Sequence, residues 1–418
     1  MSKWQIESKL TSTQERFGVQ VLGAAIREYA GYEPAVLPQA QGNCIHVAIE
    51  TDRGALAENS YMIRVDQPQD GVQQACILGA DENALMYGCM DFVNLYLPKA
   101  HFSDTSCSPY YFYPLFGEKP LPVTCQVSTP KLSHRGLWTW GHAIYDYKGY
   151  LENMARLKLN EVIIWNDYLP VNAAEVVEYA HSLGIKVIWG YAWGWNTSID
   201  LDLSDEKMLA RAADQVVEQY EREYAASNGD GIYFQSFTET SLEEVNGRLI
   251  AEVVVEWVNG IAGRILKRHP NLLLQFGLHA SSVKKRLEFI RKTDPRVHII
   301  WEDCGDFPYH YMPSRHENPD LTREFTQSML TLRPQSVTGA VLKGMICLNW
   351  NTFEHQTGPY VMGRASEAVI ARRLPEVRKN LAAHTGRVAA ARRKVPGIGA
   401  PAICAGCGIV WIGGGWSV

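Results

Sequence analysis

Carboxylates, amides and indole rings follow a series of apolar segments in this sequence, and together they could hydrolyse a glycosidic bond. In GIYFQSFTE at 231–239, an apolar stretch that reads as a buried strand is followed by Gln235 and then Glu239. Glycoside hydrolysis needs two carboxyl groups, and one of them protonates the leaving oxygen. Glu239 is a candidate for one of these two groups. Its structural alternative is a surface carboxylate at the start of the next helix.

The second carboxyl group, which would attack, activate water or orient the substrate, has three candidates. Glu302 and Asp303 close the apolar segment at 297–303, and Glu354 follows the segment at 343–350. If these segments are strands six and seven of a barrel, strands four and six face a common cavity across one intervening strand. Adjacent residues of a strand point in different directions, so one of Glu302 and Asp303 is expected to be structural.

Further polar and aromatic residues are predicted at the same strand ends, where they would bind a sugar. The loop WEDCGDFPYHYMP at 301–313 combines acids with aromatic and imidazole rings, which is typical of a loop that contacts a ligand. The predicted substrate-binding residues are Trp140, His142, Asn166, Asp167, Trp193, Trp195, Gln235, His279, Asp306, Tyr309, Trp350 and Asn351.

Some of these residues have structural alternatives. Trp193 and Trp195 could pack in the core at the barrel mouth, and Asn166 and Asp167 could cap the next helix. The histidines show no HxH or HExxH spacing, and the CxxC at 404–407 stands alone, so no metal and no cofactor are predicted. The sequence holds no G-x-S-x-G segment, which argues against a serine hydrolase.

Alternating strands and helices must position this group of residues. Strands are predicted at 134–140, 161–167, 186–195, 231–239, 272–279, 297–303 and 343–350. Helices are predicted at 147–158, 172–183, 205–227, 248–268, 281–292, 320–333 and 362–382. Near-continuous apolar strands alternating with helices indicate a parallel sheet buried on both faces. Seven or eight such units in about 250 residues favour a (β/α)8 barrel, in the α/β class, over an open sheet.

The chain divides into three predicted regions. Residues 1–127 form a small α+β domain, residues 128–372 the barrel, and residues 373–418 an atypical Ala-, Arg- and Gly-rich tail. The α+β domain is predicted from helices at 13–30 and 81–97, the second capped by Asp81, from strands at 44–51, 60–67 and 74–80, and from a linker at 110–124. The tail reads as a truncated or out-of-frame end of a longer protein, or as a basic tail that binds anions. It leaves the last barrel unit incomplete or represented only by residues 408–413.

The composition and charge of the chain predict its class of partner and its compartment. The chain has 418 residues, 46% of them apolar, and a formal net charge of −5, which argues against a nucleic-acid partner. The sequence contains no run of about 18 apolar residues, so no membrane span is predicted. The absence of an apolar signal region and the odd number of cysteines, nine, predict reduced thiols in the cytoplasm. The expected partner is a carbohydrate substrate, and the sequence carries no signal for an oligomeric state.

The first predicted strand and helix, SHRGLWTWGHAIYDYKGYLENMARLKLNEVIIW at 133–165, resemble those of retaining β-N-acetylhexosaminidases and bacterial α-glucuronidases. Both families open the barrel with an Arg-Gly strand, here Arg135-Gly136. Both follow it with a helix that leads to a K-x-N turn, here residues 158–160. Both carry a small α+β domain before the barrel, whose end is similar to residues 78–97. The resemblance runs in order over roughly residues 20–360.

The resemblance implies that Glu239 is the general acid and that the enzyme is an exo-acting glycoside hydrolase on a hexosaminide or a uronide. The hexosaminidases have an Asp directly before this Glu, which orients the substrate acetamide, whereas this chain has Thr238. The α-glucuronidases use carboxylates from strands six and seven to activate water, and Glu302 or Asp303 and Glu354 lie at those positions. A non-catalytic barrel that binds carbohydrate is the alternative.

Overall fold

The computed structural model describes residues 3–52, 55–101, 120–140, 144, 146–165, 169–194, 202–236, 243–279 and 286–302, and short stretches between 324 and 382. The chain forms two compact units. The first comprises Met1–Leu137, Lys148–Val162 and Glu178–Lys186, and the second comprises Trp138–Tyr147, Ile163–Val177 and Val187–Val418. The first unit therefore continues past residue 127.

The first unit contains a six-stranded sheet in the order β2-β1-β3-β5-β4-β6. Its strands are β1 (Gln5–Glu7), β2 (Val36–Leu37), β3 (Cys44–Ile49), β4 (Tyr61–Val65), β5 (Gln74–Gly79) and β6 (Thr124–Ser128). Strands β1, β2, β3 and β5 run parallel, and β4 runs antiparallel to both β5 and β6. The three predicted strands are confirmed. The short strands β1 and β2 were not predicted, and β6 begins where the predicted linker ends.

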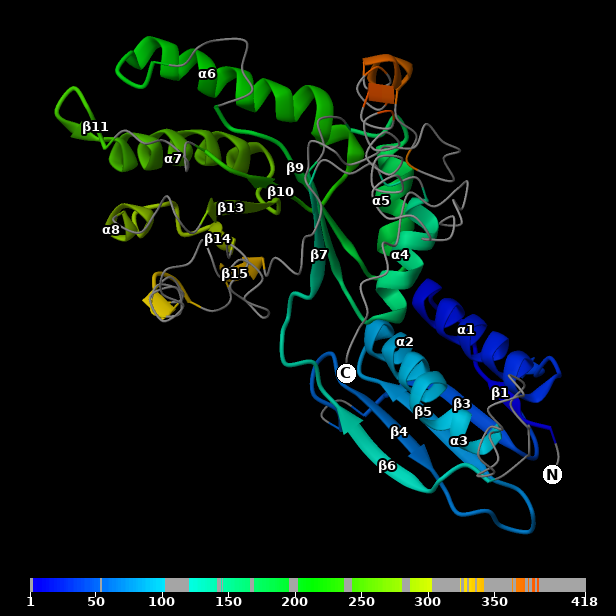
Figure 1. Cartoon of the computed structure of the whole chain (residues 1–418). Coiled ribbons are helices and arrows are strands. Elements are labelled where there is room, and N and C mark those ends of the chain that lie inside the picture. Colours follow the sequence, from blue (N-terminus) through cyan, green and yellow to red (C-terminus); the bar gives the residue numbers. More distant parts are fainter. Residues whose placement is uncertain are drawn as a thin grey trace, which may run out of the picture. The chain divides into compact units, whose positions relative to one another are not determined.

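Helices cover one face of this sheet (Figure 1). They are α1 (Thr13–Ala30) and α2 (Glu82–Asp91), which continues through a π-helical turn (Phe92–Tyr96) into α3 (Leu97–His101). The Ser12 side chain accepts a hydrogen bond from the Glu15 amide at the start of α1. Asp81 accepts one from the Ala84 amide, which confirms the predicted cap. Leu22 and Leu85, from the two helices, are fully buried in the core.

A second sheet has seven parallel strands in the sequential order β7-β8-β9-β10-β13-β14-β15. They are β7 (Gly136–Trp140), β8 (Glu161–Trp165), β9 (Lys186–Gly190), β10 (Gly231–Phe234), β13 (Leu273–His279), β14 (Val297–Glu302) and β15 (Thr338–Val341). An open doubly wound sheet reverses its strand order at a switch point, and this sheet does not. The sequential order is that of a (β/α) barrel and confirms the predicted fold class.

Helices follow the barrel strands. They are α4 (Tyr147–Arg156), α5 (Ala173–Ser182), α6 (Glu206–Gln219) with a π-helical turn (Tyr220–Tyr224) and a 3-10 turn (Ala225–Ser227), α7 (Ile250–Arg268) and α8 (Leu287–Ile290). A hairpin of β11 (Glu244–Val245) and β12 (Arg248–Leu249) precedes α7. Strand β15 lies before the strand predicted at 343–350, and that segment is outside the described residues.

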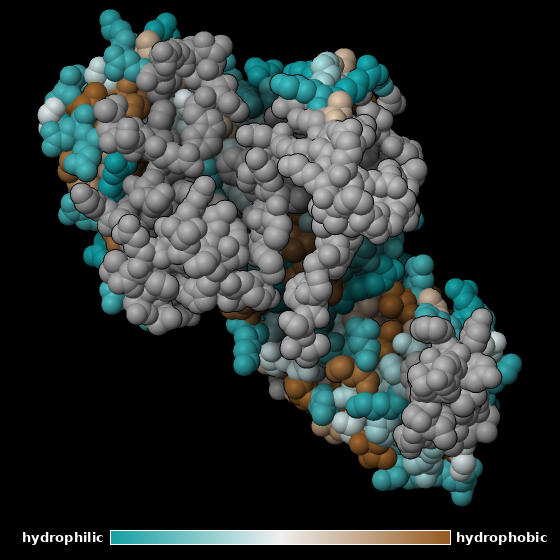
Figure 2. All heavy atoms as spheres, in the orientation of Figure 1, coloured by the Kyte–Doolittle hydropathy of each residue, from teal (hydrophilic) through white to brown (hydrophobic). Residues whose placement is uncertain are grey.

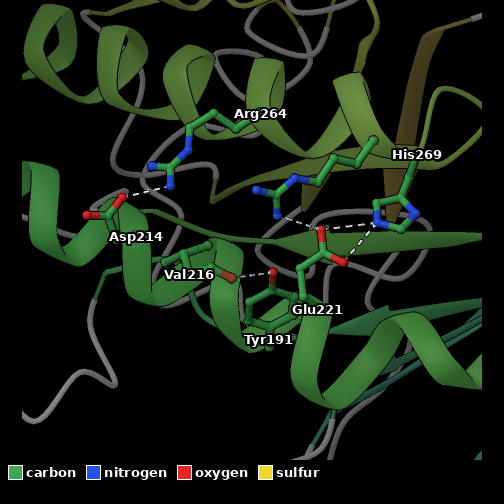
Figure 3. A network of polar contacts seen from close by, with 7 residues as sticks. Tyr191, Asp214, Val216, Glu221, Arg264 and His269 are labelled. Carbon is green, nitrogen blue, oxygen red and sulfur yellow. Dashed lines mark hydrogen bonds and ion pairs between the residues drawn. The ribbon is translucent and has the colours of Figure 1, made fainter.

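Polar contacts join α6 and its π-helical turn to α7 (Figure 3). The Arg264 guanidinium lies 2.7 Å from an Asp214 carboxylate oxygen. Glu221 accepts hydrogen bonds from Arg268 at 3.1 Å and from His269 Nε2 at 3.2 Å. Partly exposed pairs of this kind each contribute about 0–1 kcal/mol, so they fix the helix arrangement more than they stabilise it.

The described surface mixes polar and apolar side chains. Hydrophobic residues lie in small groups among hydrophilic ones in the view of Figure 2. Leu132 and Val127 of the first unit are among the exposed apolar residues, with 67% and 57% of their surface accessible. In the part of the chain that the structure describes, no helix combines the length and apolar character needed to cross a membrane.

Candidate active site

The interior of the barrel is built around Tyr233. The buried side chains of Ile163 and Trp165 from β8, Ile188 from β9 and Ile300 from β14 form a cluster with it. Side chains alternate between the two faces of a strand, so Gly231, Tyr233 and Gln235 all point inward from β10 and its extension. The same alternation places Ile300 and Glu302 on the inner face of β14.

Two side chains of β10 and its extension bind the carboxylate of Glu302. The Tyr233 hydroxyl and the Gln235 amide both donate a hydrogen bond to its Oε1 atom. All three side chains are buried, and Glu302 is only 1% exposed. The structure therefore brings together Gln235 and Glu302, which the sequence predicted, and adds Tyr233, which it did not. The signal for Tyr233 was its position two residues before Gln235, on the same face of the strand.

Gly277 makes this contact possible. Strand β13 lies between β10 and β14, pairing Gln275 with Tyr233 and His279 with Glu302. The Tyr233 side chain must therefore cross β13 to reach the carboxylate. A Cβ atom on Gly277 would overlap the Tyr233 hydroxyl, so this position has room for the phenol only because it has no side chain.

The surroundings of Tyr233 keep its hydroxyl protonated. Burial raises the pKa of this phenol well above its ordinary value, and the charge of Glu302 and the hydrogen bond to it raise the pKa further. The ring also makes edge contacts with Trp138 and Trp165, at centroid distances of 5.9 and 5.7 Å. The phenol is thus a fixed donor that orients the Glu302 carboxylate.

Trp193 lies on the other face of the β9 extension. Ile188 and Ala192 face the interior cluster, so Trp193 points outward, away from the lumen. Its ring stacks on Phe234 at 3.6 Å between centroids, and Phe234 stacks on Phe276 at 5.0 Å. The side chain is 0% exposed. Trp193 therefore packs in the core, as its structural alternative proposed, and its ring has no surface free to contact a sugar.

Most of the predicted rim lies outside the described residues, so its assignments remain predictions. For Trp140 and His279 the structure describes only the main chain, at the ends of β7 and β13. The predicted residues outside it are Glu239, Asp303, Glu354, His142, Asn166, Asp167, Trp195, Asp306, Tyr309, Trp350 and Asn351. Within the described ranges, no three His, Cys, Asp or Glu residues lie together in a way that could hold a metal ion.

The motif that carried the resemblance lies at the opposite, amino-terminal ends of the strands. The Arg135 amide donates to the Asn160 side-chain oxygen at 2.8 Å, and the Asn160 amide group donates to the Ser133 carbonyl at 2.8 Å. A Cβ atom on Gly136 would overlap the main-chain oxygen of Glu161. The Arg-Gly strand and the K-x-N turn therefore join β7 to β8. In (β/α)8 barrels this end contributes stability and the other end contributes catalysis.

Among the comparisons with known proteins, one likeness to a solved structure bears on the fold. No protein-family model matches the sequence, and no curated protein matches it. The GH20 β-N-acetylhexosaminidase from Streptomyces coelicolor A3(2) is similar over 82% of this chain and 70% of its own, with 11% identity and a TM-score of 0.50. A GH138 enzyme targeting pectin rhamnogalacturonan II is similar over 81% of this chain and 46% of its own, with 14% identity and a TM-score of 0.46. A GH115 4-O-methyl-α-glucuronidase is similar over 83% and 55%, with 14% identity and a TM-score of 0.44.

The likeness to the S. coelicolor enzyme shows the architecture of this chain. This chain has the same kind of fold, a (β/α) barrel preceded in the sequence by a small α+β unit. The chain spans about half the length of the GH138 and GH115 enzymes.

Proposed function

We propose that this protein is an exo-acting glycoside hydrolase that cleaves a hexosaminide or uronide by carboxylate acid/base catalysis. The observation that carries the proposal is the position of Glu302 and Gln235, two polar side chains at the carboxyl ends of barrel strands whose interiors are apolar. Active sites of (β/α)8 enzymes are built at this end. The glycoside hydrolase fold is consistent with this proposal.

In the proposed reaction, Glu239 protonates the leaving glycosidic oxygen, and a second carboxylate activates water or attacks the anomeric carbon. Asp303, Glu302 and Glu354 are the candidates for that second group. Thr238, in place of an acid before Glu239, disfavours a mechanism in which an acid at that position orients the substrate acetamide. No cofactor takes part in either step.

The test is turnover of aryl glycosides, including an α-glucuronide and a β-N-acetylglucosaminide, by the wild type and by Glu239→Gln. Glu244→Gln is the matched control, because Glu244 is an exposed acid on the nearby β11 hairpin. General acid catalysis contributes about 10²–10⁴-fold and matters most for poor leaving groups. Glu239→Gln should therefore lose more activity on a methoxyphenyl glycoside than on a nitrophenyl glycoside, while Glu244→Gln keeps wild-type rates.

Two results would change the proposal. Full activity of Glu239→Gln on both leaving groups would remove Glu239 from the mechanism. Sugar binding by the wild type without turnover of any glycoside would favour the non-catalytic carbohydrate-binding barrel.

A further inference from the structure

We infer that Glu302 is a positioning residue, and that it holds the end of β10 in place through Tyr233 and Gln235 instead of acting as the second catalytic carboxylate. This inference rests on the proposed function, because it assigns a role within the same site. It also narrows the second catalytic carboxylate to Asp303 or Glu354.

Burial is the first argument. A catalytic carboxylate must contact the sugar or the attacking water, and Glu302 is 1% exposed. Its Oε1 atom already accepts two hydrogen bonds, from Tyr233 and Gln235. A buried carboxylate that receives charge-assisted hydrogen bonds from fixed donors has the surroundings of a structural anchor.

The second argument is what the anchor holds. Gln235 precedes Glu239 by four residues in the sequence, so fixing Gln235 limits where the chain can place the proposed acid. The main chain there is also held from β9, since the Tyr191 amide donates to the Tyr233 carbonyl at 3.2 Å and the Trp193 amide to the Gln235 carbonyl at 3.1 Å. Main-chain bonds from β9 and side-chain bonds to Glu302 thus hold the end of β10 from two sides.

The third argument is that the structure has room for the contact between Tyr233 and Glu302. Gly277 leaves room for the Tyr233 ring to cross β13, and the edges of Trp138 and Trp165 fix the ring plane. Catalysis depends on holding an acid close to its productive position, so a fixed main chain at Gln235, four residues before Glu239, has a direct chemical consequence.

The experiment compares Glu302→Gln, Glu302→Ala and Tyr233→Phe with Asp303→Ala and Glu354→Ala, using the best aryl glycoside of the wild type. We expect Glu302→Gln and Tyr233→Phe to lower kcat about tenfold with KM unchanged. The first variant keeps an oxygen acceptor but loses the charge, and the second keeps the hydrogen bond from Gln235 to Glu302. Glu302→Ala should lower kcat about 10²–10³-fold, and azide or formate should not restore it. In Glu302→Gln, kcat/KM should still fall on both the acidic and the alkaline limb of its pH profile, as in the wild type.

Small anions restore activity when they replace a missing nucleophile or base, so they separate the two roles. Rescue of Glu302→Ala by azide, or loss of the acidic limb of the pH profile in Glu302→Gln, would overturn the inference. Rescue of Asp303→Ala or Glu354→Ala alone would support it.

A stability measurement keeps the inference testable if the wild type turns over no glycoside, which would defeat the proposed function alone. The double-mutant cycle of Tyr233→Phe and Glu302→Gln should show coupling of about tenfold or more in the unfolding equilibrium constant, which is about 1.4 kcal/mol. Gly277→Ala should mimic Tyr233→Phe, because it displaces the phenol without removing any polar group. Gly339→Ala is its control, since a Cβ atom there meets only the end of the Ile300 side chain. Additive effects of Tyr233→Phe and Glu302→Gln would overturn the inference.

Discussion

The side chain of Arg135 donates a hydrogen bond from Nε to the main-chain oxygen of Lys158, at 2.9 Å. Its Nη1 atom donates to the Leu132 carbonyl at 2.6 Å, and the guanidinium lies 5.5 Å from the centre of the Tyr87 ring. One side chain thus connects the Arg-Gly strand, the K-x-N turn and helix α2 of the first unit. Arg135, which belongs to the segment that resembles the hexosaminidases and α-glucuronidases, therefore has a structural role in this unit.

Replacing Arg135 should destabilise the protein without touching the chemistry. Arg135→Ala loses two hydrogen bonds from a charged group, so the free energy of unfolding should fall by about 2–3 kcal/mol. The free energy of unfolding of Arg135→Lys should lie between those of the wild type and Arg135→Ala, because an ammonium group cannot reach both carbonyls with the geometry of a guanidinium. Urea denaturation measures both changes.

The control is Arg64→Ala, which removes a half-exposed ion pair with Asp66 at 3.4 Å. It should change the free energy of unfolding by less than about 1 kcal/mol. Equal losses in the two alanine variants would contradict the assignment of Arg135 as a structural connector.

Much of the fold could be predicted because apolar runs and helix caps are local signals. The strand at 44–51 and the cap at Asp81 needed only neighbouring residues to be recognised. Strands β1 and β2 could not be predicted, because runs of three and two residues have no periodicity of their own. Pairing with longer neighbours makes them strands, and that pairing is a tertiary contact.

The candidate site was predictable in its residue types but not in its contacts. Glu302 and Gln235 follow from the rule that functional groups lie at strand ends. The bond from Tyr233 to Glu302 depends on the register of two strand pairs and on the missing side chain of Gly277, which the sequence does not display. Trp193 was predicted to bind substrate, but side chains alternate between the two faces of a strand. Since Ile188 points inward, Trp193, five residues later, points outward.

The same substitution should have opposite effects at two glycines. Gly136→Ala would push a methyl group into the main-chain oxygen of Glu161, and we expect a loss of about 2–3 kcal/mol in the free energy of unfolding. Gly260 lies inside helix α7, and apart from its own helix no described residue comes within 4 Å of the place that a Cβ atom would take. Gly260→Ala should therefore stabilise the protein by about 0.5–1 kcal/mol, because glycine is unfavourable within a helix. Thermal denaturation of both variants checks this, and destabilisation by Gly260→Ala would contradict the packing described for α7.

Trp193 offers a test that separates packing from sugar binding. Trp193→Ala should lower the free energy of unfolding by about 3–5 kcal/mol, since it removes a fully buried ring stacked on Phe234. Trp193→Phe keeps a stacked ring and should lose less, with KM for a glycoside unchanged. A raised KM in Trp193→Phe with unaltered stability would instead make this indole a sugar contact.

Stability should fall at alkaline pH through a cluster at the K-x-N turn. Lys158 Nζ lies 2.6 Å from an Asp91 carboxylate oxygen, and the Tyr61 hydroxyl donates to the other oxygen of Asp91. Burial opposes the charge on Lys158, but the hydrogen bond and the charge of Asp91 outweigh it and raise the pKa of the ammonium group. Burial and the hydrogen bond to Asp91 also raise the pKa of Tyr61.

The pKa values of Lys158 and Tyr61 are both raised in the folded protein. Above a pH of about 10, where Tyr and Lys titrate in the unfolded chain, the folded protein holds protons that the unfolded chain has lost. The stabilisation is therefore complete below that pH and disappears as the pH rises through the raised pKa values of the folded state.

Asp91→Asn isolates this contribution. It should cost about 1–2 kcal/mol at pH 8, and the difference from the wild type should shrink as the pH rises above about 10. Asp66→Asn is the control, because it removes an ion pair that contains neither a lysine nor a tyrosine. Urea unfolding at a series of pH values gives both curves. A difference between the wild type and Asp91→Asn that stays constant with pH would show that the charge of Lys158 contributes nothing to the free energy of unfolding.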